Sequence, residues 1–397
     1  MHPADDLRGI KSNKLFQKRI ILAVTGSIAA VETIKLAREL IRHGAEVFPV
    51  MTSTATKIIH PDALEFATSN KPIIELTGKV EHVYYCGLVK KPVDLVLICP
   101  CTANTISKIA HGIDDTPVTT FATTAIGSDI PVIVVPAMHL SMYNHKAVEK
   151  NIKKCKKLGV TIIEPAISNT KAKMPGIDEI VSNVIRKSTK KHHLADKDIL
   201  IIGGATAEPI DNIRILTNIS SGKTAVSLAI SAYEKGANVE LWYGHSMEPV
   251  PLFINVKSFQ TVQDIFDLLK KNKKKFYAVI VCAAIADYIP KKYNGKIPSK
   301  KPNLLIECSP APKVLEEIHK IAPKSKLIAF KAEYNKIAIE KEAEKLLKKY
   351  SLYQVIGNTT TAFGSKTNKI VIINRKGEKT VKQGKKELLS EYIINTL

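Results

Sequence analysis

Three features are missing from this sequence, and each absence excludes a class of protein. The six cysteines form no Cys-x-x-Cys pair and have no histidines near them at zinc spacing, which argues against a zinc ribbon or a disulfide scaffold. The longest apolar stretches, such as residues 130–138, fall well short of the roughly 20 residues that cross a bilayer. Residues 1–14 lack the apolar core of a signal peptide. We therefore expect a cytoplasmic protein with reduced thiols and no membrane partner.

Acidic residues are also scarce, at 37 against 59 lysines and arginines, which leaves a net charge of +22. Such a field attracts polyanions or concentrates small anionic substrates. A lysine-rich solvated surface of the kind found in heat-adapted proteins gives the same balance. The basic runs at residues 153–157 and 270–275 lack the interleaved aromatic residues that bind single-stranded nucleic acid. We interpret the charge as a solvated surface and predict no nucleic-acid partner.

The rest of the composition fits a globular protein with more than one domain. Hydrophobic residues make up 45% of the 397-residue chain and charged residues 24%, which excludes wholesale disorder. At about 150 residues per domain, this length predicts two or three domains.

A strand, a tight turn, a helix and a second strand are predicted near the start of the chain. Residues 20–25 are a β-branched apolar run that ends at Gly26 and Ser27. A helical pattern of apolar residues follows and stops at Gly44, and residues 47–51 return to a strand pattern. This order is typical of a nucleotide-binding α/β unit.

The same order recurs in the second half of the chain. A strand at residues 199–204 meets a glycine pair, and a helix at about 223–235 leads to a strand at 239–243. The fold class predicted is therefore α/β, with two doubly wound, Rossmann-like parallel-sheet domains in tandem. The domains are expected at residues 1–190 and 191–397.

The linker between the two halves is polar and basic at residues 186–193. The pair His192 and His193 could bind a metal ion, but we interpret it as part of a solvated linker. Further strand patterns lie at residues 95–99, 132–135, 160–163, 278–282, 327–330, 354–357 and 369–374. Nearly continuous apolar strands separated by helices predict parallel sheets that are covered on both faces.

Three strand ends in the first half carry polar or small residues. Gly26 and Ser27 begin a turn that opens a helix, where free N–H groups and the helix dipole favour a phosphate. Thr52 ends the next strand, and residues 100–105 end another. Carboxyl ends of parallel strands converge on one crevice, which would suit a mononucleotide such as FMN. A tight structural turn is the alternative.

Two histidines accompany this edge of the sheet. His139 follows a strand, and His82 is expected in a loop after a short apolar stretch. Either imidazole could transfer a proton or recognise a carboxylate, and either could be a hydrogen-bonded surface residue.

Four segments of the first half form one set: Gly26-Ser27-Ile28-Ala29-Ala30, Pro100-x-Thr102-Ala103-Asn104-Thr105, Gly112-Ile113-Asp114-Asp115 and Pro136-Ala137-Met138-x-x-x-Met142-Tyr143. Together they resemble the FMN-dependent cysteine decarboxylases.

Three segments of the second half form another set: Gly203-Gly204-Ala205-Thr206-Ala207-Glu208-Pro209-Ile210-Asp211-x-x-Arg214, Thr217-Asn218-x-Ser220-Ser221-Gly222-Lys223, and Ala283-Ala284-x-Ala286-Asp287-Tyr288 with Lys296. These look like phosphopantothenate–cysteine ligase. The whole chain thus resembles the bifunctional enzymes of coenzyme A biosynthesis.

One segment of the second half mimics a Walker A loop. The order Ser221-Gly222-Lys223-Thr224 matches the end of that motif, which requires a glycine at position 217. Thr217 occupies that position, so a P-loop NTPase is a poor interpretation.

The resemblance implies roles for residues of the first half. Thioaldehyde formation by FMN would let the carboxylate leave as carbon dioxide with its electron pair delocalised on sulfur. His82 matches the family's essential histidine and would act as a base or a carboxylate partner. The residues implied at the flavin are Gly26, Ser27 and Thr52 for its phosphate, with Thr102, Asn104 and Thr105 along the cofactor.

Two residues of the first half depart from the family pattern. His139 stands where the family has an asparagine that grips the substrate carboxylate, and we expect it to replace that asparagine. The flexible loop that carries the family's proton-donating cysteine corresponds to residues 168–176, which contain none. Cys155 is the nearest thiol, on an expected helix. Lys171, Lys173 or a bound water is our hypothesis for the proton source.

In the second half, the resemblance implies that phosphopantothenate attacks CTP in the presence of Mg²⁺ to form an acyl-cytidylate, which cysteine then converts to the amide. Lys296 would neutralise the triphosphate, Asn218 would steady the acyl-cytidylate, and Arg214 would engage phosphate or carboxylate. Residues 291–302 would suit a lid. The residues implied at CTP are Ala284, Asp287, Lys296, Phe330, Lys345 and Lys349, with Asp287 the candidate for Mg²⁺. A solvated helix face is the alternative for Lys345 and Lys349.

Small-molecule substrates are therefore expected, namely 4'-phosphopantothenate, L-cysteine and CTP. By analogy, a homo-oligomer is expected, with trimeric flavin domains, dimeric ligase domains and a dodecamer as one outcome. Two alternatives stay open: a nucleic-acid-binding or scaffold protein with two Rossmann-like folds, and a ligase whose flavin-binding half has lost its activity.

Overall fold

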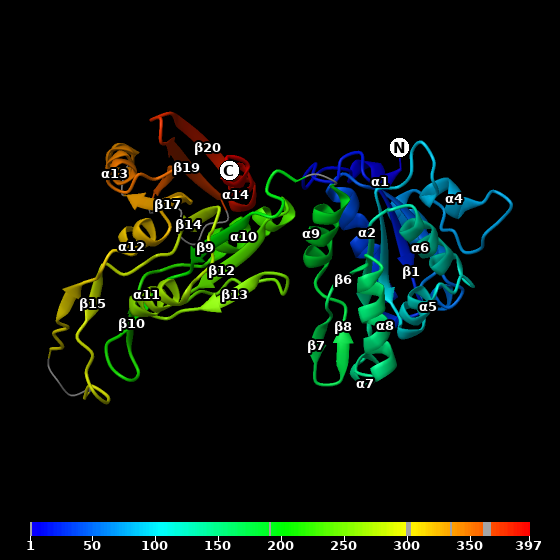
Figure 1. Cartoon of the computed structure of the whole chain (residues 1–397), viewed down its shortest axis with the longest axis horizontal. Helices are drawn as coiled ribbons and strands as arrows, with labels where there is room; N and C mark the ends of the chain where they lie inside the picture. Colours follow the sequence, from blue (N-terminus) through cyan, green and yellow to red (C-terminus); the bar gives the residue numbers. More distant parts are fainter. Residues whose placement is uncertain (1, 190–191, 299–302, 334–335, 360–366) are drawn as a thin grey trace. The chain divides into compact units, whose positions relative to one another are not determined.

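The computed structural model describes residues 2–189, 192–298, 303–333, 336–359 and 367–397 (Figure 1). The chain divides into two compact units, Met1–Lys191 and His192–Leu397. The predicted boundary between residues 190 and 191 lies outside the described residues. Among the described residues, no helix combines the length and the apolar character that crossing a membrane requires.

The first unit is built on a five-stranded sheet with the order β2-β1-β3-β4-β6, and its neighbouring strands are all parallel. The strands are β1 (Arg19–Val24), β2 (Glu46–Met51), β3 (Leu95–Cys101), β4 (Val132–Pro136) and β6 (Thr161–Ile162). A separate three-stranded sheet is formed by β5 (Met138–His139), β7 (Ala166–Ser168) and β8 (Lys171–Lys173). Residues 168–176, expected as a flexible loop, therefore begin in a hairpin.

Both faces of this first sheet are buried along its central strands, because β1, β2 and β3 are apolar at every position except Arg19 and Glu46, the first residues of β1 and β2. In β1, Ile20 and Leu22 belong to one core cluster, while Ile21 and Ala23 belong to the other. The first cluster includes residues of α2 (Thr33–Arg42), α3 (Pro61–Thr68) and α9 (Ile177–Ser188). The second includes residues of α4 (Glu81–Cys86), α5 (Ala103–His111), α6 (Pro117–Gly127) and α8 (Lys146–Lys157). The other short elements of this unit are α1 (Pro3–Asp6), η1 (Ile28–Glu32), η2 (Ala55–Lys57) and α7 (Leu140–Tyr143).

The second unit has an eight-stranded sheet with the order β13-β12-β9-β14-β17-β18-β19-β20. The strands are β9 (Asp198–Gly203), β12 (Asn238–Tyr243), β13 (Asn255–Ser258), β14 (Ala278–Val281), β17 (Lys326–Glu333), β18 (Gln354–Thr359), β19 (Thr367–Asn374) and β20 (Lys379–Lys385). One face packs on α10 (Lys223–Glu234) and α14 (Lys386–Asn395). The other packs on α11 (Val262–Lys271), α12 (Val314–Ile321) and α13 (Lys336–Lys349).

The predicted fold class is confirmed, and the second sheet adds a feature at one edge. Strands β13 to β18 are parallel, whereas β19 and β20 are antiparallel to their neighbours. A short turn joins β19 to β20, in which the N–H of Gly377 donates to the carbonyl of Asn374 at 2.8 Å. Strands that a short turn joins can pair only in antiparallel order. Two hairpins lie outside the sheet: β10 (Ala207–Pro209) with β11 (Ile215–Thr217), and β15 (Tyr288–Pro290) with β16 (Cys308–Pro310).

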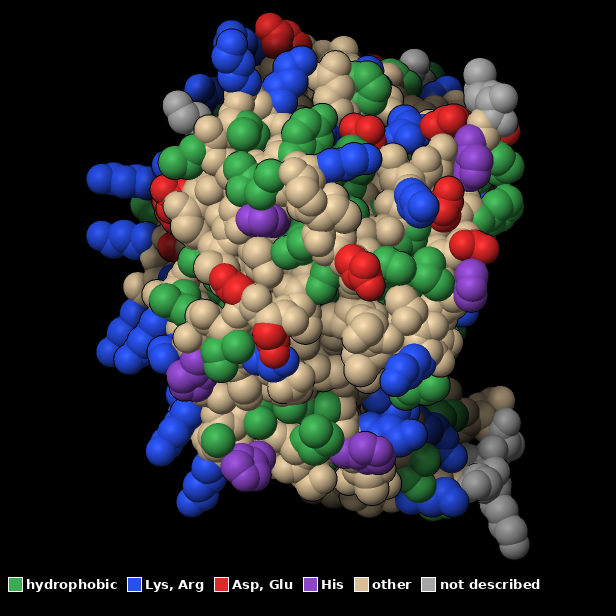
Figure 2. Space-filling view, turned by 90° about the vertical axis from the view of Figure 1, so that its right-hand side faces the viewer, with side chains coloured by type: hydrophobic (Ala, Val, Ile, Leu, Met, Phe, Trp, Pro, Cys, Tyr) green, Lys and Arg blue, Asp and Glu red, His purple; other side chains and the backbone are tan. Residues whose placement is uncertain are grey.

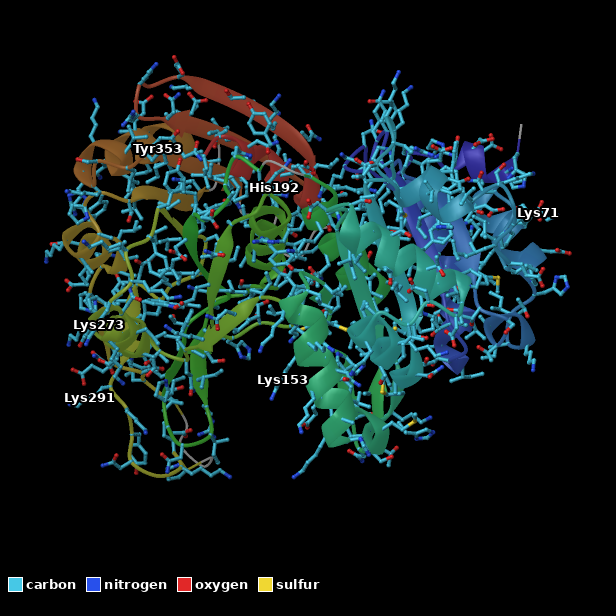
Figure 3. The ribbon with its side chains drawn as sticks, turned by 45° about the vertical axis from the view of Figure 1, so that its right-hand side comes forward. Lys71, Lys153, His192, Lys273, Lys291 and Tyr353 are labelled. Carbon is cyan, nitrogen blue, oxygen red and sulfur yellow. The ribbon has the colours of Figure 1, made fainter. Side chains whose placement is uncertain are left out.

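The excess positive charge lies on the surface of the units. On the face shown in Figure 2, basic side chains project at the left margin and gather at the lower right, while the middle carries fewer of them among apolar, acidic and uncharged groups. Lys153 on α8, Lys273 after α11 and Lys291 after β15 are all exposed (Figure 3). This arrangement supports the interpretation of the basic runs as solvated surface.

Candidate functional site

The first unit contains a cavity of about 800 Å³ at the carboxyl ends of its strands. Its walls come from the residues that follow β1, β3 and β4, and from β8 with the residues after it. In the strand order β2-β1-β3-β4-β6, the direction of the crossovers reverses between β1 and β3. Open α/β sheets bind ligands at this kind of switch point. The cavity therefore lies where the strand ends predicted a crevice.

The turn after β1 has no room for a side chain at Gly26. A Cβ at this position would lie 2.6 Å from the hydroxyl oxygen of Thr54. The next hydroxyl, that of Ser27, donates to the carbonyl of Ala137 at 3.0 Å and so ties this turn to the loop after β4. The first N–H groups of η1 have no acceptor within the helix. A cradle that lacks a side chain and offers free N–H groups fits a phosphate.

The loop after β3 is fixed by threonine hydroxyls. The hydroxyl of Thr102 accepts the N–H of Thr105 at 3.3 Å and so caps α5. The N–H of Thr102 donates to the hydroxyl of Thr25, which itself donates to the carbonyl of Pro100 at 2.8 Å. These bonds join the ends of β1 and β3, the two strands that flank the switch point.

The six residues predicted at the flavin divide into two groups. Gly26, Ser27 and Thr102 line the cavity. The other three do not line it: Thr105 is buried beneath the cap of α5, Asn104 is exposed, and Thr52 is buried after β2. The hydroxyl of Thr52 lies 3.0 Å from that of Thr54, so it adjoins the residue that packs on Gly26.

His139 lies at the cavity opposite a lysine. It is the last residue of β5, its side chain is exposed, and it lines the cavity. In the antiparallel pairing of β5 with β8, His139 is directly opposite Lys171, and Met138 is opposite Ala172. Side chains of directly opposed residues lie on the same face of a sheet. The site therefore places an imidazole and an ammonium group side by side.

The cavity is richer in cationic groups than in anionic ones. Lys171 and Lys173 line it, and Glu32 is its one acidic residue. The carboxylate of Glu32 pairs with the ammonium of Lys35 at 3.1 Å. An anionic ligand is therefore favoured in the cavity.

His82 is in a helix, not in the expected loop. It occupies the first turn of α4, is half-buried, and does not line the cavity. Its Nδ1 atom is buried and has no hydrogen-bond partner among the described residues. The expectation of a loop was wrong because the six-residue helix is too short to show a helical period.

The thiols of the first unit are all covered. Cys86, Cys99, Cys101 and Cys155 are buried, and burial raises the pKa of the Cys155 thiol to about 11. Cys155 is on α8, as expected, and its Sγ contacts the carbonyl of Ile106 at 3.6 Å. None of the residues that line the cavity is a cysteine.

In the second unit, the ends of β9 and β14 are held together by Thr206. Its hydroxyl accepts the N–H of Ala286 at 2.9 Å, and its own N–H donates to the carbonyl of Ala284 at 3.3 Å. The side-chain amide of Asn218 donates to the carbonyls of Ala284 and Ile285, both at 3.3 Å. Two predicted residues, Asn218 and Ala284, are thus brought together at a sheet edge.

A second group of polar contacts surrounds Asp211, at the tip of the β10–β11 hairpin. The N–H of Ile297 donates to its carboxylate at 3.0 Å, and the N–H groups of Ile213 and Arg214 donate at 2.8 and 2.6 Å. The guanidinium of Arg214 donates to it at 2.5 Å. These donors, first that of Ile297, hold the pKa of the Asp211 carboxyl well below its usual range.

This group anchors the segment that contains Lys296. The carbonyl of Ile297 accepts from Arg214, and that of Gly295 accepts the N–H of Asn212 at 3.1 Å. Lys296 is itself exposed. Three paired residues of each strand lie between the hairpin tip and Asn218, which follows Thr217. The contacts of Asp211 at the tip and those of Asn218 are therefore about 10 Å apart along the hairpin. The hairpin therefore links Lys296 and Asn218 without placing their backbones in contact.

The remaining residues predicted at CTP have local partners. The carboxylate of Asp287 pairs with the ammonium of Lys313 at 2.6 Å, and Phe330 is half-buried against the core. Lys345 lies 3.6 Å from Glu342 on its own helix, and the ammonium of Lys349 lies 5.0 Å from the ring centre of Tyr350. These contacts support a solvated face for the last two. Of the predicted lid, residues 299–302 lie outside the described residues.

The sequence did not predict several residues that contact the candidate site residues. Thr54, Thr25 and Lys313 were not predicted, although the two threonines lie at the ends of β1 and β2, where the motif residues also lie. That position was the available signal. Within the described part of the chain, no group of three or more His, Cys, Asp or Glu side chains is placed to hold a metal ion.

Comparison with known proteins accounts for both units. Residues 8–189 match the family model described as Flavoprotein, and residues 194–397 match that of the DNA/pantothenate metabolism flavoprotein C-terminal domain. The coenzyme A biosynthesis bifunctional protein CoaBC of Thermococcus kodakarensis is 45% identical over 399 residues, which cover 99% of this chain and 98% of that protein. Its namesake from Methanocaldococcus jannaschii is 39% identical over 401 residues, covering 99% of this chain and 96% of that protein.

A solved structure of the C-terminal domain of a coenzyme A biosynthesis bifunctional protein CoaBC is 28% identical, with a TM-score of 0.45, and the match covers 52% of this chain and 96% of that one. The two family matches together span nearly the whole sequence, in the order that the motifs indicated. The chain therefore belongs to the family of bifunctional coenzyme A biosynthesis proteins, and it joins a flavoprotein domain to a DNA/pantothenate metabolism flavoprotein C-terminal domain.

Proposed function

We propose that residues 191–397 ligate L-cysteine to 4'-phosphopantothenate with CTP and Mg²⁺, and that residues 1–190 decarboxylate the product to 4'-phosphopantetheine with FMN. The observation that carries the proposal is the cavity of about 800 Å³ at the β1/β3 switch point, which is lined by Gly26, Ser27, Thr102 and His139 among the residues that the decarboxylase resemblance implies. Membership of the bifunctional family supports the pairing of the two activities.

The residues of the cavity fit a flavin mononucleotide. When bound, FMN supplies the acceptor and donor of hydride. The glycine cradle at Gly26, the hydroxyl of Ser27 and the free N–H groups of η1 would hold its phosphate. Thr102, at the end of the next strand, would lie along the cofactor. Thr52 and Thr105 would act behind the lining residues, through the contacts of their hydroxyls with those of Thr54 and Thr102. Asn104 is exposed and stays in the proposed flavin set on the resemblance alone.

The carboxylate of the substrate needs a hydrogen-bond donor that orients it. His139 lines the cavity and can donate a hydrogen bond from its imidazole. We assign to His139 the orientation of the carboxylate.

His82 would act from a second copy of the chain. It does not line the cavity of its own unit, and its buried Nδ1 has no partner among the described residues. In the expected homo-oligomer, with trimeric flavin domains and dimeric ligase domains, a neighbouring copy would bring it to the site. Mixing the variants His82→Asn and Gly26→Ala should then give more activity than the sum of the two variants alone, because some sites receive one intact contribution from each chain.

In the ligase half, exposed donors would meet the nucleotide at the ends of β9 and β14. Lys296 would neutralise the triphosphate, and Asn218 would steady the acyl-cytidylate beside Ala284. Arg214 is 37% exposed, so part of its guanidinium can reach phosphate or carboxylate. Mg²⁺ commonly binds through one or two carboxylates and substrate phosphates. Asp287 would fit this role by releasing Lys313.

One incubation tests both halves. Full-length protein is mixed with phosphopantothenate, cysteine and either CTP or ATP, and the products are identified by mass spectrometry. The proposal expects 4'-phosphopantetheine with CTP and a yellow protein with flavin absorbance. Amide without decarboxylation would favour a ligase with an inactive flavin half. A colourless protein that forms no amide would favour the scaffold alternative.

A further inference from the structure

The decarboxylase reaction, which is the proposed function of the first unit, needs a proton at one carbon. When carbon dioxide leaves, its electron pair stays on the α-carbon and is delocalised over the adjacent carbon and sulfur as an enethiolate. The α-carbon must then gain a proton before the adjacent carbon can accept hydride. Four titratable residues line the cavity and are candidates: Glu32, His139, Lys171 and Lys173.

None of the thiols of the first unit lines this cavity. The thiol of Cys99 contacts one lining residue, because its Sγ lies 3.3 Å from the Sδ of Met174. Met174 lines the cavity, whereas Cys99 is fully buried and does not. Burial also raises the pKa of the Cys99 thiol far above its usual range. A thioether therefore stands between this thiol and any bound substrate.

Glu32 is also unsuited to donate a proton. Its carboxylate pairs with Lys35 at 3.1 Å, and an ionised carboxylate can only accept hydrogen bonds. Among the side chains that line the cavity, His139, Lys171 and Lys173 are therefore the candidates that remain.

The β-ladder distinguishes the two lysines. Lys171 is directly opposite His139 of β5 and Ser168 of β7, whereas Lys173 lies beyond the two-residue pairing with β5 and is opposite Ala166 of β7. Strand β8, which Figure 1 shows beside β7, lies between β5 and β7, and Lys173 is two residues along it on the same face, at a diagonal distance of about 7–8 Å from His139. Directly opposed residues have Cβ atoms about 4.5–5.5 Å apart and share one face. Lys171 is therefore the lysine beside the residue that orients the carboxylate.

We propose that Lys171 protonates the α-carbon of the decarboxylated substrate. The carboxylate that His139 orients is bonded to the α-carbon, so its departure leaves that carbon next to the ammonium of Lys171. The two residues then divide the work, because His139 orients the leaving group and Lys171 acts only after it has left.

The step balances without a further reagent. An N–H bond of the ammonium breaks, and the proton goes to the α-carbon. The electron pair of the C=C bond forms the new C–H bond, and the negative charge on sulfur forms a C=S bond. The resulting thioaldehyde accepts the hydride that was removed in the first oxidation, which gives the thiolate of the product. Lys171 is exposed, so its neutral amine regains a proton from water.

The test supplies phosphopantothenoylcysteine to the full-length, flavin-loaded protein without oxygen. For Lys171→Gln we expect carbon dioxide release to continue, while the yield of saturated 4'-phosphopantetheine falls about 100-fold, the size of a typical general-acid effect. The product should be the enethiol, two hydrogens lighter, and the flavin absorbance should stay bleached. Lys171→Arg keeps the charge but is a poor acid, so it should behave like Lys171→Gln.

Two further variants complete the test. Lys173→Gln should still give the saturated product, and Lys153→Gln, an exposed change on α8, should match the wild type. Flavin content and the melting temperature confirm that each variant is folded. The proposal is overturned if Lys171→Gln or Lys171→Arg gives the saturated product with reoxidised flavin, or if His139→Gln or Lys173→Gln alone gives the enethiol. If wild-type protein releases no carbon dioxide, the proposed function itself fails, which is a different result.

Discussion

The two units use the same edge of an α/β sheet, but they hold their candidate residues differently. In the first unit, Gly26, Ser27 and Thr102 follow directly on β1 and β3, so the strands themselves fix them. In the second unit, Asn218 and Lys296 lie beyond the strand ends, on the β10–β11 hairpin and on a segment bonded to its tip.

The two sites therefore differ in which interactions fix the positions of their candidate residues. A loop bonded to two central strands moves little unless the sheet unfolds. A hairpin of three-residue strands depends on the hydrogen bonds at its tip, here those of Asp211. We therefore expect the first site to be sensitive to packing at the strand ends, and the second to single polar contacts.

The largest effect is expected at Lys296. Lys296→Gln removes the cation from the proposed triphosphate site, and the loss of one such transition-state contact typically lowers the rate by about 10² to 10³. Pyrophosphate release with CTP, phosphopantothenate and cysteine measures it. The exposed neighbour Lys292 provides a matched control, Lys292→Gln, which should change the rate less than threefold. Decarboxylation of supplied phosphopantothenoylcysteine should continue in both variants, and its loss would contradict the separation of the two sites.

A somewhat smaller effect is expected at the hairpin tip. Asp211→Asn weakens the bonds to Ile297, Ile213 and Arg214 at once, so the segment of Lys296 loses its anchor. Ligation should fall roughly 10- to 100-fold, as expected for charge-assisted hydrogen bonds. The depressed pKa of Asp211 also means that ligation should lose this anchor only in strong acid, as the pH falls through that low value. Asp267→Asn on α11 is the control, and an equal loss there would show a general defect.

These sites show how far the sequence alone could go. The main strands were predictable because each is a continuous apolar run between turn residues, as in β1 and β9. The hairpins were not, because strands of three residues such as β10 and β15 are too short for any period to show. The antiparallel edge at β19 and β20 was missed for a related reason, since the exposed strand β20 is polar along most of its length.

The same limit applies to the candidate residues. Gly26, Ser27 and Thr102 were predictable because residues just after parallel strands converge at one edge. That the hydroxyl of Thr105 lies 3.2 Å from that of Thr102, the N-cap of α5, and does not line the cavity depends on side-chain rotamers, which a motif does not specify. The pairing of His139 with Lys171 depends on strand register between residues about 30 apart, and no local pattern encodes it.

A change at Gly26 tests whether the strand ends fix the first site. In Gly26→Ala the new Cβ would overlap the side chain of Thr54, so we expect flavin to bind about tenfold more weakly. Absorbance after dialysis measures the flavin retained. The double variant Gly26→Ala with Thr54→Gly removes the overlap and should recover most of it. Gly127→Ala is the control, because a Cβ there meets open space. Undiminished flavin in the single variant would show that this turn adapts.

The smallest expected effect is on the pH dependence of stability, which should differ between the two units. His43 is buried in the first unit, where its Nδ1 lies 2.6 Å from the hydroxyl of Ser12. Burial and the nearby ammonium of Lys11 lower the pKa of His43 to about 4, against the partial opposition of Glu39. Between pH 6.5 and pH 4, His43 therefore binds a proton in the unfolded chain but not in the folded unit. The stability that this histidine contributes is complete above pH 6.5 and falls as the pH drops toward 4. At pH 5 the loss should be at most about 2 kcal/mol. Urea titrations of the wild type and of His43→Gln measure it: between pH 8 and pH 5 the variant should lose less stability in the first unit, while the transition of the second unit should be the same in both proteins. An equal pH dependence of the first unit in the two proteins would place the acid sensitivity at other groups.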